Sequence, residues 1–220
     1  MPHILNKILD NNVEIVWLGH SSFRLRALDK NIVIYIDPFN LVKPKFLANF
    51  IFITHPHFDH FSLKDIKKIS TEKTKFIVPK ELYTFFPNKA ISLSPSDSYD
   101  FVNFGVDGVA AYNITKSYHP KEKSWLGYLI KLNGLRIYHA GDTDFIPEMS
   151  SVRGSDYAML PIGGLYTMDV EEACRACLTI KPRYAIPMHY GSIVGEEELG
   201  EEFADKAPCD SIVMIPYRDD

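Results

Sequence analysis

The chain has 220 residues, a formal net charge of −4, 46% hydrophobic residues and 24% charged residues, which is ordinary for a globular protein. This length accommodates a single domain over residues 1–220 with a substantial buried core. The acidic balance lacks the basic excess that marks nucleic-acid binding, so we expect no nucleic-acid partner.

The cysteines and the apolar runs bear on the cellular compartment. Cys174, Cys177 and Cys209 are too few, and odd in number, for a disulfide framework, which favours a reducing environment. The N-terminus lacks a basic region followed by an apolar one, and no uninterrupted apolar run approaches membrane-spanning length. We therefore expect a soluble, cytoplasmic protein with no membrane association, and the sequence leaves homo-oligomerisation open.

Short runs of β-branched and aromatic residues, bounded by Gly, Pro, Asn or Asp, predict a strand-rich chain. Asn133 and Gly134 separate two of these runs and predict a hairpin. The predicted strands lie at residues 13–18, 22–28, 31–36, 49–54, 75–79, 99–104, 109–114, 126–132, 135–140, 156–162, 184–188 and 211–216.

Four helices are predicted between these strands, at residues 61–70, 79–86, 167–180 and 195–207. Ser62 with Asp65, and Asp169 with Glu172, have the spacing of capping boxes at the starts of two of them. Many strands with few helices indicate an α/β (α+β) fold in which two sheets pack face to face with helices outside. The helix over 167–180 carries an apolar stripe, in which Cys174-x-x-Cys177 reads as core packing rather than a redox or zinc motif; that stripe comprises Ala173, Cys174, Cys177 and Leu178.

The stretch "THPHFDHFS" concentrates potential metal ligands directly after the strand predicted at 49–54. His55 and His57, two residues apart, can face one metal ion from an extended segment. Asp59 and His60 follow and could face a second ion. A polar loop in which histidines coincide is the alternative, but four candidate ligands within six residues favour a metal site. Neutral imidazole and carboxylate suit zinc, manganese or iron.

Two ions would need more ligands than this loop supplies. His119, Asp142 and His189 each stand in a loop near an apolar run and beside Gly, Pro or turn residues. Taken singly, each could be an ordinary polar residue. Taken with the cluster, they complete a set for two metals, placed where loops converge at a sheet edge.

In order, these residues resemble the five motifs of the metallo-β-lactamase-fold hydrolases, over nearly the whole chain. Asp37 in "YIDPF" matches the first motif. Phrases such as "WLGHSSFRL", "LPIGGLYTMD" and "IKPRYAIPMHYG" resemble the ascorbate-6-phosphate lactonase-like branch. The resemblance implies a four-layer αββα sandwich with its site at one edge. The other four motifs are matched by His55, His57, Asp59 and His60, then by His119, Asp142 and His189.

The resemblance also implies roles for these side chains. One ion would be bound by His55, His57 and His119, the other by Asp59, His60 and His189, with Asp142 bridging them. Asp37 would orient a ligand imidazole from outside the ligand set. His20 and His139 could hydrogen-bond to a metal ligand, contact the substrate or be purely structural histidines.

The expected activity is that of a metal-dependent hydrolase with two divalent ions, most simply Zn²⁺, with Mn²⁺ or Fe²⁺ as alternatives. A metal-bridging hydroxide would attack a small-molecule ester, lactone or phosphorylated metabolite, and Asp59 could accept a proton as the catalytic residue. The alternatives are a phosphodiesterase or nuclease on the same fold and a non-catalytic metal-binding protein. Asp142 in place of a Cys argues against antibiotic hydrolysis.

The segment after His119 is a candidate for substrate specificity. Lys121, Lys123 and Trp125 could border the pocket and contact an anionic or ring-bearing substrate; a solvated lysine loop with Trp125 packed inward is the favoured alternative. Gly163 and Gly164 permit close backbone approach. Tyr166 beyond them could point inward, and a plain tight turn is the alternative.

Overall fold

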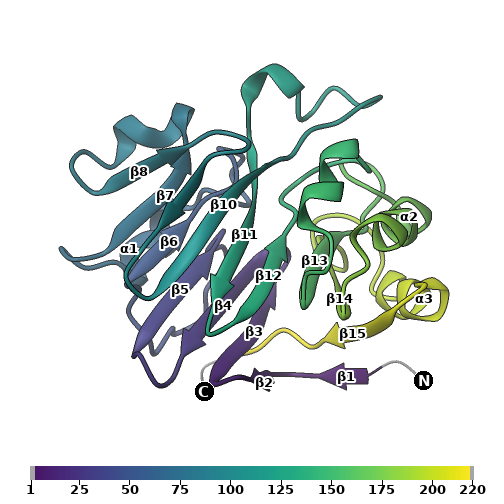
Figure 1. Cartoon of the computed structure of the whole chain (residues 1–220), viewed down its shortest axis with the longest axis horizontal. Helices are drawn as coiled ribbons and strands as arrows, with labels where there is room; N and C mark the ends of the chain where they lie inside the picture. Colours follow the sequence, from purple (N-terminus) through teal and green to yellow (C-terminus); the bar gives the residue numbers. More distant parts are fainter. Residues whose placement is uncertain (1–2, 219–220) are drawn as a thin grey trace.

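The computed structural model describes residues 3–218, which form two β-sheets and the helices around them (Figure 1). The strands are β1 His3–Leu5, β2 Ile8–Asp10, β3 Val13–Gly19, β4 Ser22–Ala27, β5 Ile32–Ile36, β6 Phe50–Phe52, β7 Lys75–Pro79, β8 Ala90–Leu93, β9 Ser98–Asp100, β10 Phe104–Ala110, β11 Leu126–Leu132, β12 Leu135–His139, β13 Tyr157–Pro161, β14 Tyr184–Met188 and β15 Asp210–Met214. The α-helices are α1 Leu63–Ile69, α2 Val170–Ile180 and α3 Leu199–Lys206, and the 3₁₀ helices are η1 Lys80–Phe85, η2 Lys121–Lys123 and η3 Pro147–Val152.

Each sheet joins an antiparallel part to a parallel part. The first has the order β2-β3-β4-β5-β6-β7-β8, antiparallel up to β5 and parallel from β5 to β8. The second has the order β1-β15-β14-β13-β12-β11-β10-β9, parallel from β1 to β12 and antiparallel beyond. Strands covered on both faces read as continuous apolar runs, and β5, β13 and β14 do so.

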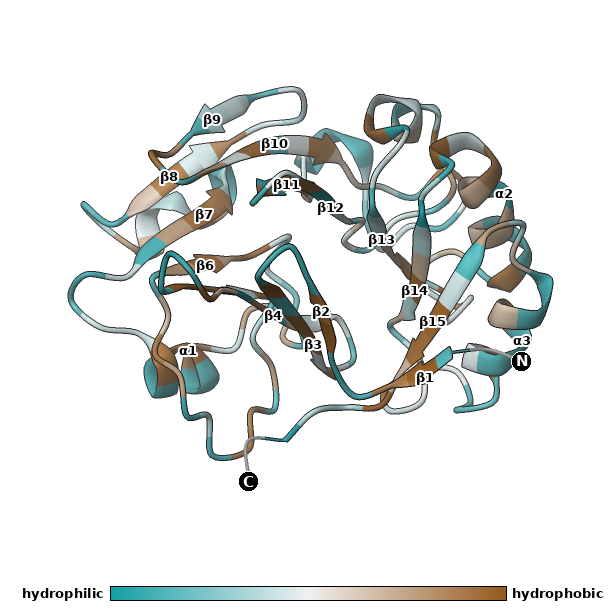
Figure 2. Cartoon of the chain, turned by 60° about the horizontal axis from the view of Figure 1, so that its bottom comes forward, coloured by the Kyte–Doolittle hydropathy of each residue, from teal (hydrophilic) through white to brown (hydrophobic). Residues whose placement is uncertain are grey.

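The helices cover the outer faces of the two sheets. Ile66 and Ile69 of α1 pack with Ile51 and Val78 in a core on the outer side of the first sheet. A larger core fills the space between the sheets and continues beneath α2 and α3. Figure 2 shows α1 on one side of the paired sheets and α2 and α3 on the other. The predicted four-layer αββα sandwich is thereby confirmed.

The helix ends follow the predicted capping residues in part. The Asp169 side chain accepts from the Glu172 N–H while Glu172 bonds back to Asp169, a complete capping box on α2. Ser62 caps α1 by accepting from the Asp65 N–H. The Asp65 carboxylate bonds the loop before β6 instead of the Ser62 backbone, accepting from the N–H groups of Asn40 and Leu41 at 2.9 and 3.1 Å.

Three predictions for helical segments need correction. Residues 79–86 form no α-helix: Pro79 ends β7 and the 3₁₀ helix η1 follows. The last helix begins at Leu199, because Gly195 adopts a φ of +69°, which an α-helix excludes. Leu178 leaves the predicted stripe and is 60% exposed, whereas Cys174 and Cys177 are buried free thiols, which confirms their predicted role in core packing.

Two predicted strands were misplaced. Residues 99–104 contain the turn between β9 and β10, with Val102 fully exposed at its tip. The strand predicted at 109–114 lies instead at 104–110, because residues 111–114 leave the sheet toward the loop that contains His119. Asn133 and Gly134, with φ of 51° and 81°, form the predicted hairpin turn between β11 and β12.

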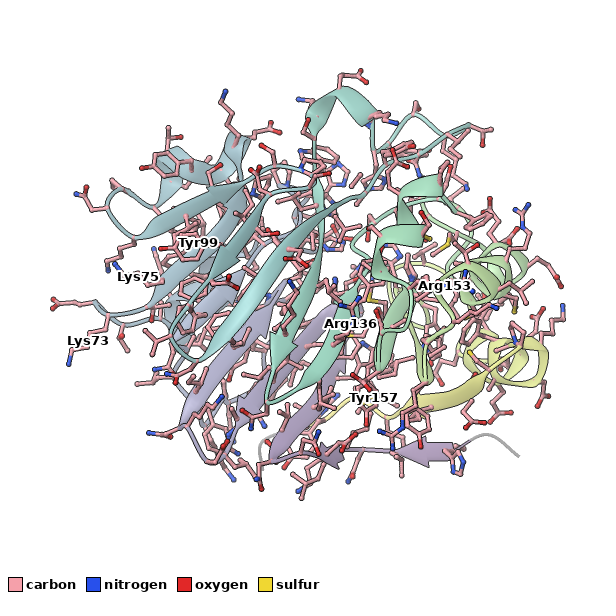
Figure 3. All side chains as sticks on the ribbon, viewed as in Figure 1. Lys73, Lys75, Tyr99, Arg136, Arg153 and Tyr157 are labelled. Atoms are coloured by element: carbon pink, nitrogen blue, oxygen red, sulfur yellow. The ribbon has the colours of Figure 1, made fainter. Side chains whose placement is uncertain are left out.

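The chain direction fixes the edge at which polar loops gather. Strands β6, β12 and β14 all lead into segments that carry candidate ligands, and their parallel neighbours run the same way. The starts of β7, β12 and β13 carry Lys75, Arg136 and Tyr157 (Figure 3), which therefore mark the opposite edge. Among the described residues, no helix has the length and apolar character needed to cross a membrane.

Candidate metal centre

The "THPHFDH" loop starts where β6 ends and supplies half of a buried polar cluster. The Nε2 atom of His55 and the Nδ1 atom of His57 lie 3.0 Å apart, so both rings present a nitrogen to the same point. The His119 ring lies against both, with centroid distances of 5.1 and 4.9 Å. One ligand atom from each of His55, His57 and His119 falls within 4.8 Å of the others, which is compatible with a shared ion.

A second group forms on the other side of the loop. Asp59, His60 and His189 come together there, and His20 joins them: one ligand atom from each of the four lies within 4.8 Å of the others. The His20 Nε2 atom lies 2.9 Å from Asp59 Oδ2, and its ring lies 4.1 Å from that of His189. The structure thus places the His20 ring beside the candidate ligands Asp59 and His189.

Asp142 lies between the two groups. Its Oδ2 atom is 3.4 Å from His119 Nε2 and 2.9 Å from His189 Nε2, and its Oδ1 atom is 3.3 Å from His60 Nε2. His55 and His60 form a third ligand group with it. Asp142 is therefore the carboxylate that both groups share.

Asp37 and Thr54 hold two of the imidazoles in orientation. Asp37 Oδ2 lies 2.7 Å from His60 Nδ1, and the same carboxylate accepts from the Thr54 N–H at 2.8 Å and from the Thr54 hydroxyl at 2.6 Å. The Thr54 hydroxyl also lies 2.9 Å from His55 Nδ1. A proton on each Nδ1 leaves the Nε2 lone pair of His55 and His60 directed into the cluster.

Asn113 performs the same task for His119. Its Oδ1 atom lies 3.0 Å from His119 Nδ1 and accepts from the His119 N–H at 2.9 Å. The Asn113 amide nitrogen in turn donates to Asp144, which Lys116 contacts at 2.7 Å. Asn113 and Thr54 were missed as site residues, because an amide and a hydroxyl of this kind are frequent in loops and only their partners reveal their role.

Three side chains of the cluster stand on strained backbone. His20, Asp37 and His189 have φ angles of 52°, 45° and 59°, in the left-handed region that residues with a Cβ rarely adopt. Such strain concentrates at functional sites, where the surrounding structure enforces it. Here the His189 N–H donates to the His20 carbonyl at 3.0 Å, tying two of these turns together.

Burial and mutual charges shift the pKa values across the cluster. Burial lowers the pKa of His55 well below its usual value and lowers that of His20 to about 4. Burial opposes ionisation of Asp59, but the hydrogen bond from His20 lowers the pKa of Asp59 to about 2. Burial also opposes the charged form of His60, yet the carboxylates of Asp142 and Asp37 raise the pKa of His60 well above its usual value. Opposite shifts in neighbouring groups are characteristic of functional sites.

Within residues 3–218, three buried atoms at the centre of the cluster have no hydrogen-bond partner: His60 Nε2, His119 Nε2 and Asp142 Oδ1. An unsatisfied buried polar atom costs stability, and so many converging at one place require a ligand. Two imidazole nitrogens and a carboxylate oxygen are the donors that zinc, manganese and iron accept. The residues present therefore fit divalent metal ions.

The remaining sequence candidates lie outside the cluster. His139 places its Nε2 atom 2.9 Å from the Ser21 carbonyl, and its Nδ1 atom accepts from the Gly141 N–H, which gives both nitrogens a structural partner. Tyr166 packs edge-on against Tyr118 at 4.6 Å. With Gly163, close backbone approach is needed: a Cβ there would lie 2.5 Å from the His189 carbonyl.

The segment after His119 matches the predicted alternative of a lysine loop with Trp125 turned inward. Trp125 is 5% exposed, and its indole N–H donates to Glu81 at 2.9 Å. Its ring packs against those of His55 and His57 at about 5 Å. Lys121 pairs with Glu148 and Lys123 with Glu81, so both lysines have acidic partners within the protein.

Comparison with known proteins identifies the family of this chain. The family model of the beta-lactamase superfamily domain matches residues 14–189, a range that contains every predicted metal ligand. A UPF0173 metal-dependent hydrolase from Thermoplasma acidophilum is 35% identical over 196 residues, which are 82% of this chain and 84% of that protein. Another from Pyrococcus abyssi is 32% identical and covers 93% of this chain and 97% of its own. The chain belongs to the UPF0173 metal-dependent hydrolase family.

Solved structures agree with this membership. A chain from Parabacteroides distasonis superposes with a TM-score of 0.82 at 29% identity, covering 94% of this chain and 96% of its own. A metallo hydrolase from Ignicoccus hospitalis superposes with a TM-score of 0.75 at 25% identity, covering 93% and 95%. The expected fold and the expected class, a metal-dependent hydrolase of the metallo-β-lactamase superfamily, are confirmed by the family. The ligand assignment stays a prediction.

Proposed function

We propose that this UPF0173 protein is a dinuclear metal-dependent hydrolase. The observation that carries the proposal is the convergence of two ligand groups on one carboxylate, Asp142. One group consists of histidines alone, and the other adds the carboxylate of Asp59. A single ion would leave one of these buried groups without a partner, at a cost in stability.

His55, His57 and His119 would hold one ion, and Asp59, His60 and His189 the other, with Asp142 shared. We propose zinc, since four-coordinate nitrogen and oxygen sites suit it, and the same donors accept manganese or iron. Two such ions, when bound, supply Lewis-acid activation of water and polarise the bond to be hydrolysed.

The chain's own residues prepare the site for that chemistry. Asp59 is anionic at neutral pH, and while His20 holds its Oδ2 atom the other carboxylate oxygen can accept a proton. Asp37 holds His60 in the tautomer that leaves Nε2 free, and Asn113 does so for His119. Trp125 packs against the rings of His55 and His57 and supports their orientation from that side.

For the substrate we propose a small-molecule ester, lactone or phosphorylated metabolite, in line with the sequence resemblance to the ascorbate-6-phosphate lactonase-like branch. The acidic net charge and the short spacing between Asp142 and His189 favour this class over a nuclease. Since fold does not fix substrate, the reaction must be tested directly.

Metal analysis tests the dinuclear centre most simply. Protein purified with added Zn²⁺ should contain about two ions per chain, and Asp142→Ala should lose both ions together with hydrolysis of lactone, ester and phosphodiester probes. His3→Ala, at an exposed strand position outside the cluster, is the matched control and should retain both ions. Wild-type metal content in both His55→Ala and Asp142→Ala would show that the ions bind elsewhere. Two bound ions with no hydrolysis of any probe would favour the non-catalytic alternative.

A further inference from the structure

A cavity of about 740 Å³ lies next to the Asp59 side of the candidate metal centre. It is bounded by the end of β3, the loop before β6, the loop after β14 and the segment that follows β15. This volume is typical of pockets that bind small molecules. Its walls are largely aromatic and aliphatic, and include Trp17, Tyr35, Phe39, Tyr190, Ile193 and Tyr217.

His20 joins this cavity to the metal centre. It lines the cavity, while its Nε2 atom lies 2.9 Å from Asp59 Oδ2. Phe39 also lines the cavity and packs on His20, with ring centroids 6.2 Å apart, and on the 70% exposed Phe58 beside Asp59. The cavity therefore ends one side chain away from the proposed ligands.

The aromatic walls are held in place before any ligand arrives. The Trp17 and Tyr190 rings stack at 5.6 Å, and the Trp17 indole N–H donates to the His20 carbonyl at 2.8 Å. Tyr35 donates its hydroxyl to the Phe46 carbonyl at 2.9 Å, and the Tyr217 N–H donates to the Trp17 carbonyl. Preformed walls lower the entropic cost of binding.

The outer part of the cavity leaves apolar surface exposed to water. Val42, Ile193 and Ile215 line it and are 48%, 43% and 53% exposed. The two charged residues of the lining, Glu197 and Arg218, have opposite signs, so they do not select an ion of one charge. This surface is suited to an uncharged apolar group.

We propose that this cavity binds the apolar acyl chain of the substrate, so that the protein prefers esters or lactones of medium-chain carboxylic acids. The proposal rests on the proposed hydrolase function and names its substrate class. With the chain in the cavity, the carbonyl group lies past Phe39 and His20, on the side of Asp59. Attack by water cleaves the acyl C–O bond; an ester gives the free acid and the alcohol, and a lactone gives the corresponding hydroxy acid.

The first test measures binding without catalysis. Straight-chain alcohols from butanol to octanol are titrated calorimetrically into Asp142→Asn, whose proposed metal centre is broken. Affinity should rise about fourfold per methylene, as expected when each is removed from water. Val42→Trp and Ile193→Trp, which fill the mouth from two walls, should weaken octanol binding at least tenfold. Leu47→Trp is the matched control, since Leu47 lies in the same loop as Val42, is 58% exposed and does not line the cavity.

The second test uses 4-nitrophenyl esters from acetate to octanoate with zinc-loaded protein. In the wild type, KM should fall with chain length, and Val42→Trp should raise KM for octanoate, whereas Leu47→Trp should leave KM and kcat unchanged for both octanoate and acetate. The proposal would be overturned if the affinity for alcohols did not change from butanol to octanol. Equal effects of Val42→Trp and Leu47→Trp on octanol binding would also overturn it. So would a wild-type dimer that only Val42→Trp dissociates in sedimentation, because the cavity would then be an interface. Chain-length-dependent binding without hydrolysis of any ester would support the apolar cavity and refute the proposed function.

Discussion

The two halves of the candidate metal centre differ in charge and in access. The half built from His55, His57 and His119, here called the histidine half, has no carboxylate of its own, and Trp125 packs against all three rings. The other half contains Asp59, borders the large cavity and includes two groups whose pKa values are shifted in opposite directions, Asp59 and His60. The histidine half is therefore packed against an aromatic ring, whereas the other half, the Asp59 half, carries a carboxylate and adjoins the cavity proposed for the substrate.

The largest expected effect is on the residue that both halves share. Asp142→Asn removes negative charge from between the two groups, and the histidine half then has no anionic ligand of its own. We expect loss of both ions and a fall in kcat/KM of more than about 10²-fold, beyond the range typical of residues outside the ligand set. Metal analysis and ester kinetics on the same preparation check this. Retention of one tightly bound ion would show that the halves are independent.

Next in size is removal of one ligand from either half. His55→Ala should prevent metal binding in the histidine half, and His189→Ala should prevent it in the Asp59 half. Each variant should therefore retain about one ion per chain. Anomalous diffraction at the zinc edge would show which position is filled in each variant. If His55→Ala lost both ions while His189→Ala kept one, the histidine half would have to bind its ion before the Asp59 half.

The orienting residues offer a finer comparison. Asp37→Asn disturbs His60 in the Asp59 half, and Asn113→Ala disturbs His119 in the histidine half. Each should weaken zinc binding 10–100-fold in its own half, as is usual for partners of ligating histidines. Competition with a chelator, which resolves two affinities, measures this. Equal weakening of both affinities by either variant would contradict the division into two halves.

The smallest expected effect concerns the wall of the cavity. Asp65 accepts from the N–H groups of Asn40 and Leu41, both of which line it. Asp65→Asn should lower the free energy of unfolding by about 2 kcal/mol, because hydrogen bonds to a charged acceptor are lost. Urea denaturation with a chelator present measures this without a contribution from metal binding. Asp205→Asn, on the exposed side of α3, should have no effect.

The ionisation of Asp65 also makes the free energy of unfolding depend on pH. Burial opposes ionisation of Asp65, but hydrogen bonds from Lys68, Ser62 and Asn40 lower its pKa below the ordinary value of 3.8. The unfolded chain therefore takes up the proton first as the pH falls. The stability that Asp65 contributes is complete above pH 3.8 and is lost as the pH falls through its lower folded pKa. Asp65→Asn should show a shallower decline in stability over that acid range.

Much of the fold could be predicted because the sequence patterns are local. Runs such as 126–132 and 184–188 coincide with β11 and β14, since apolar β-branched residues with turn residues at both ends have few other uses. The errors occurred where tertiary contacts decide. Residues 111–114 are as apolar as a strand, yet the Ala111 N–H donates to Trp125 and the Asn113 N–H to His119, which draws this segment into the site loop.

The site divides in the same way. The sequence by itself determined the family and the candidate ligands, because histidines and aspartates in a fixed order after strands are rare outside metal sites. Only the tertiary structure decided that His20 joins the Asp59 group, that Asn113 orients His119 and that an apolar cavity adjoins one half. The contact of His20 and the cavity depend on segments far apart in the chain, such as the 2.9 Å between His20 and Asp59, and the Asn113 contact depends on the shape of the loop between it and His119. Such distances depend on the order of strands within a sheet and on how the two sheets pack, and no local pattern of residues encodes either.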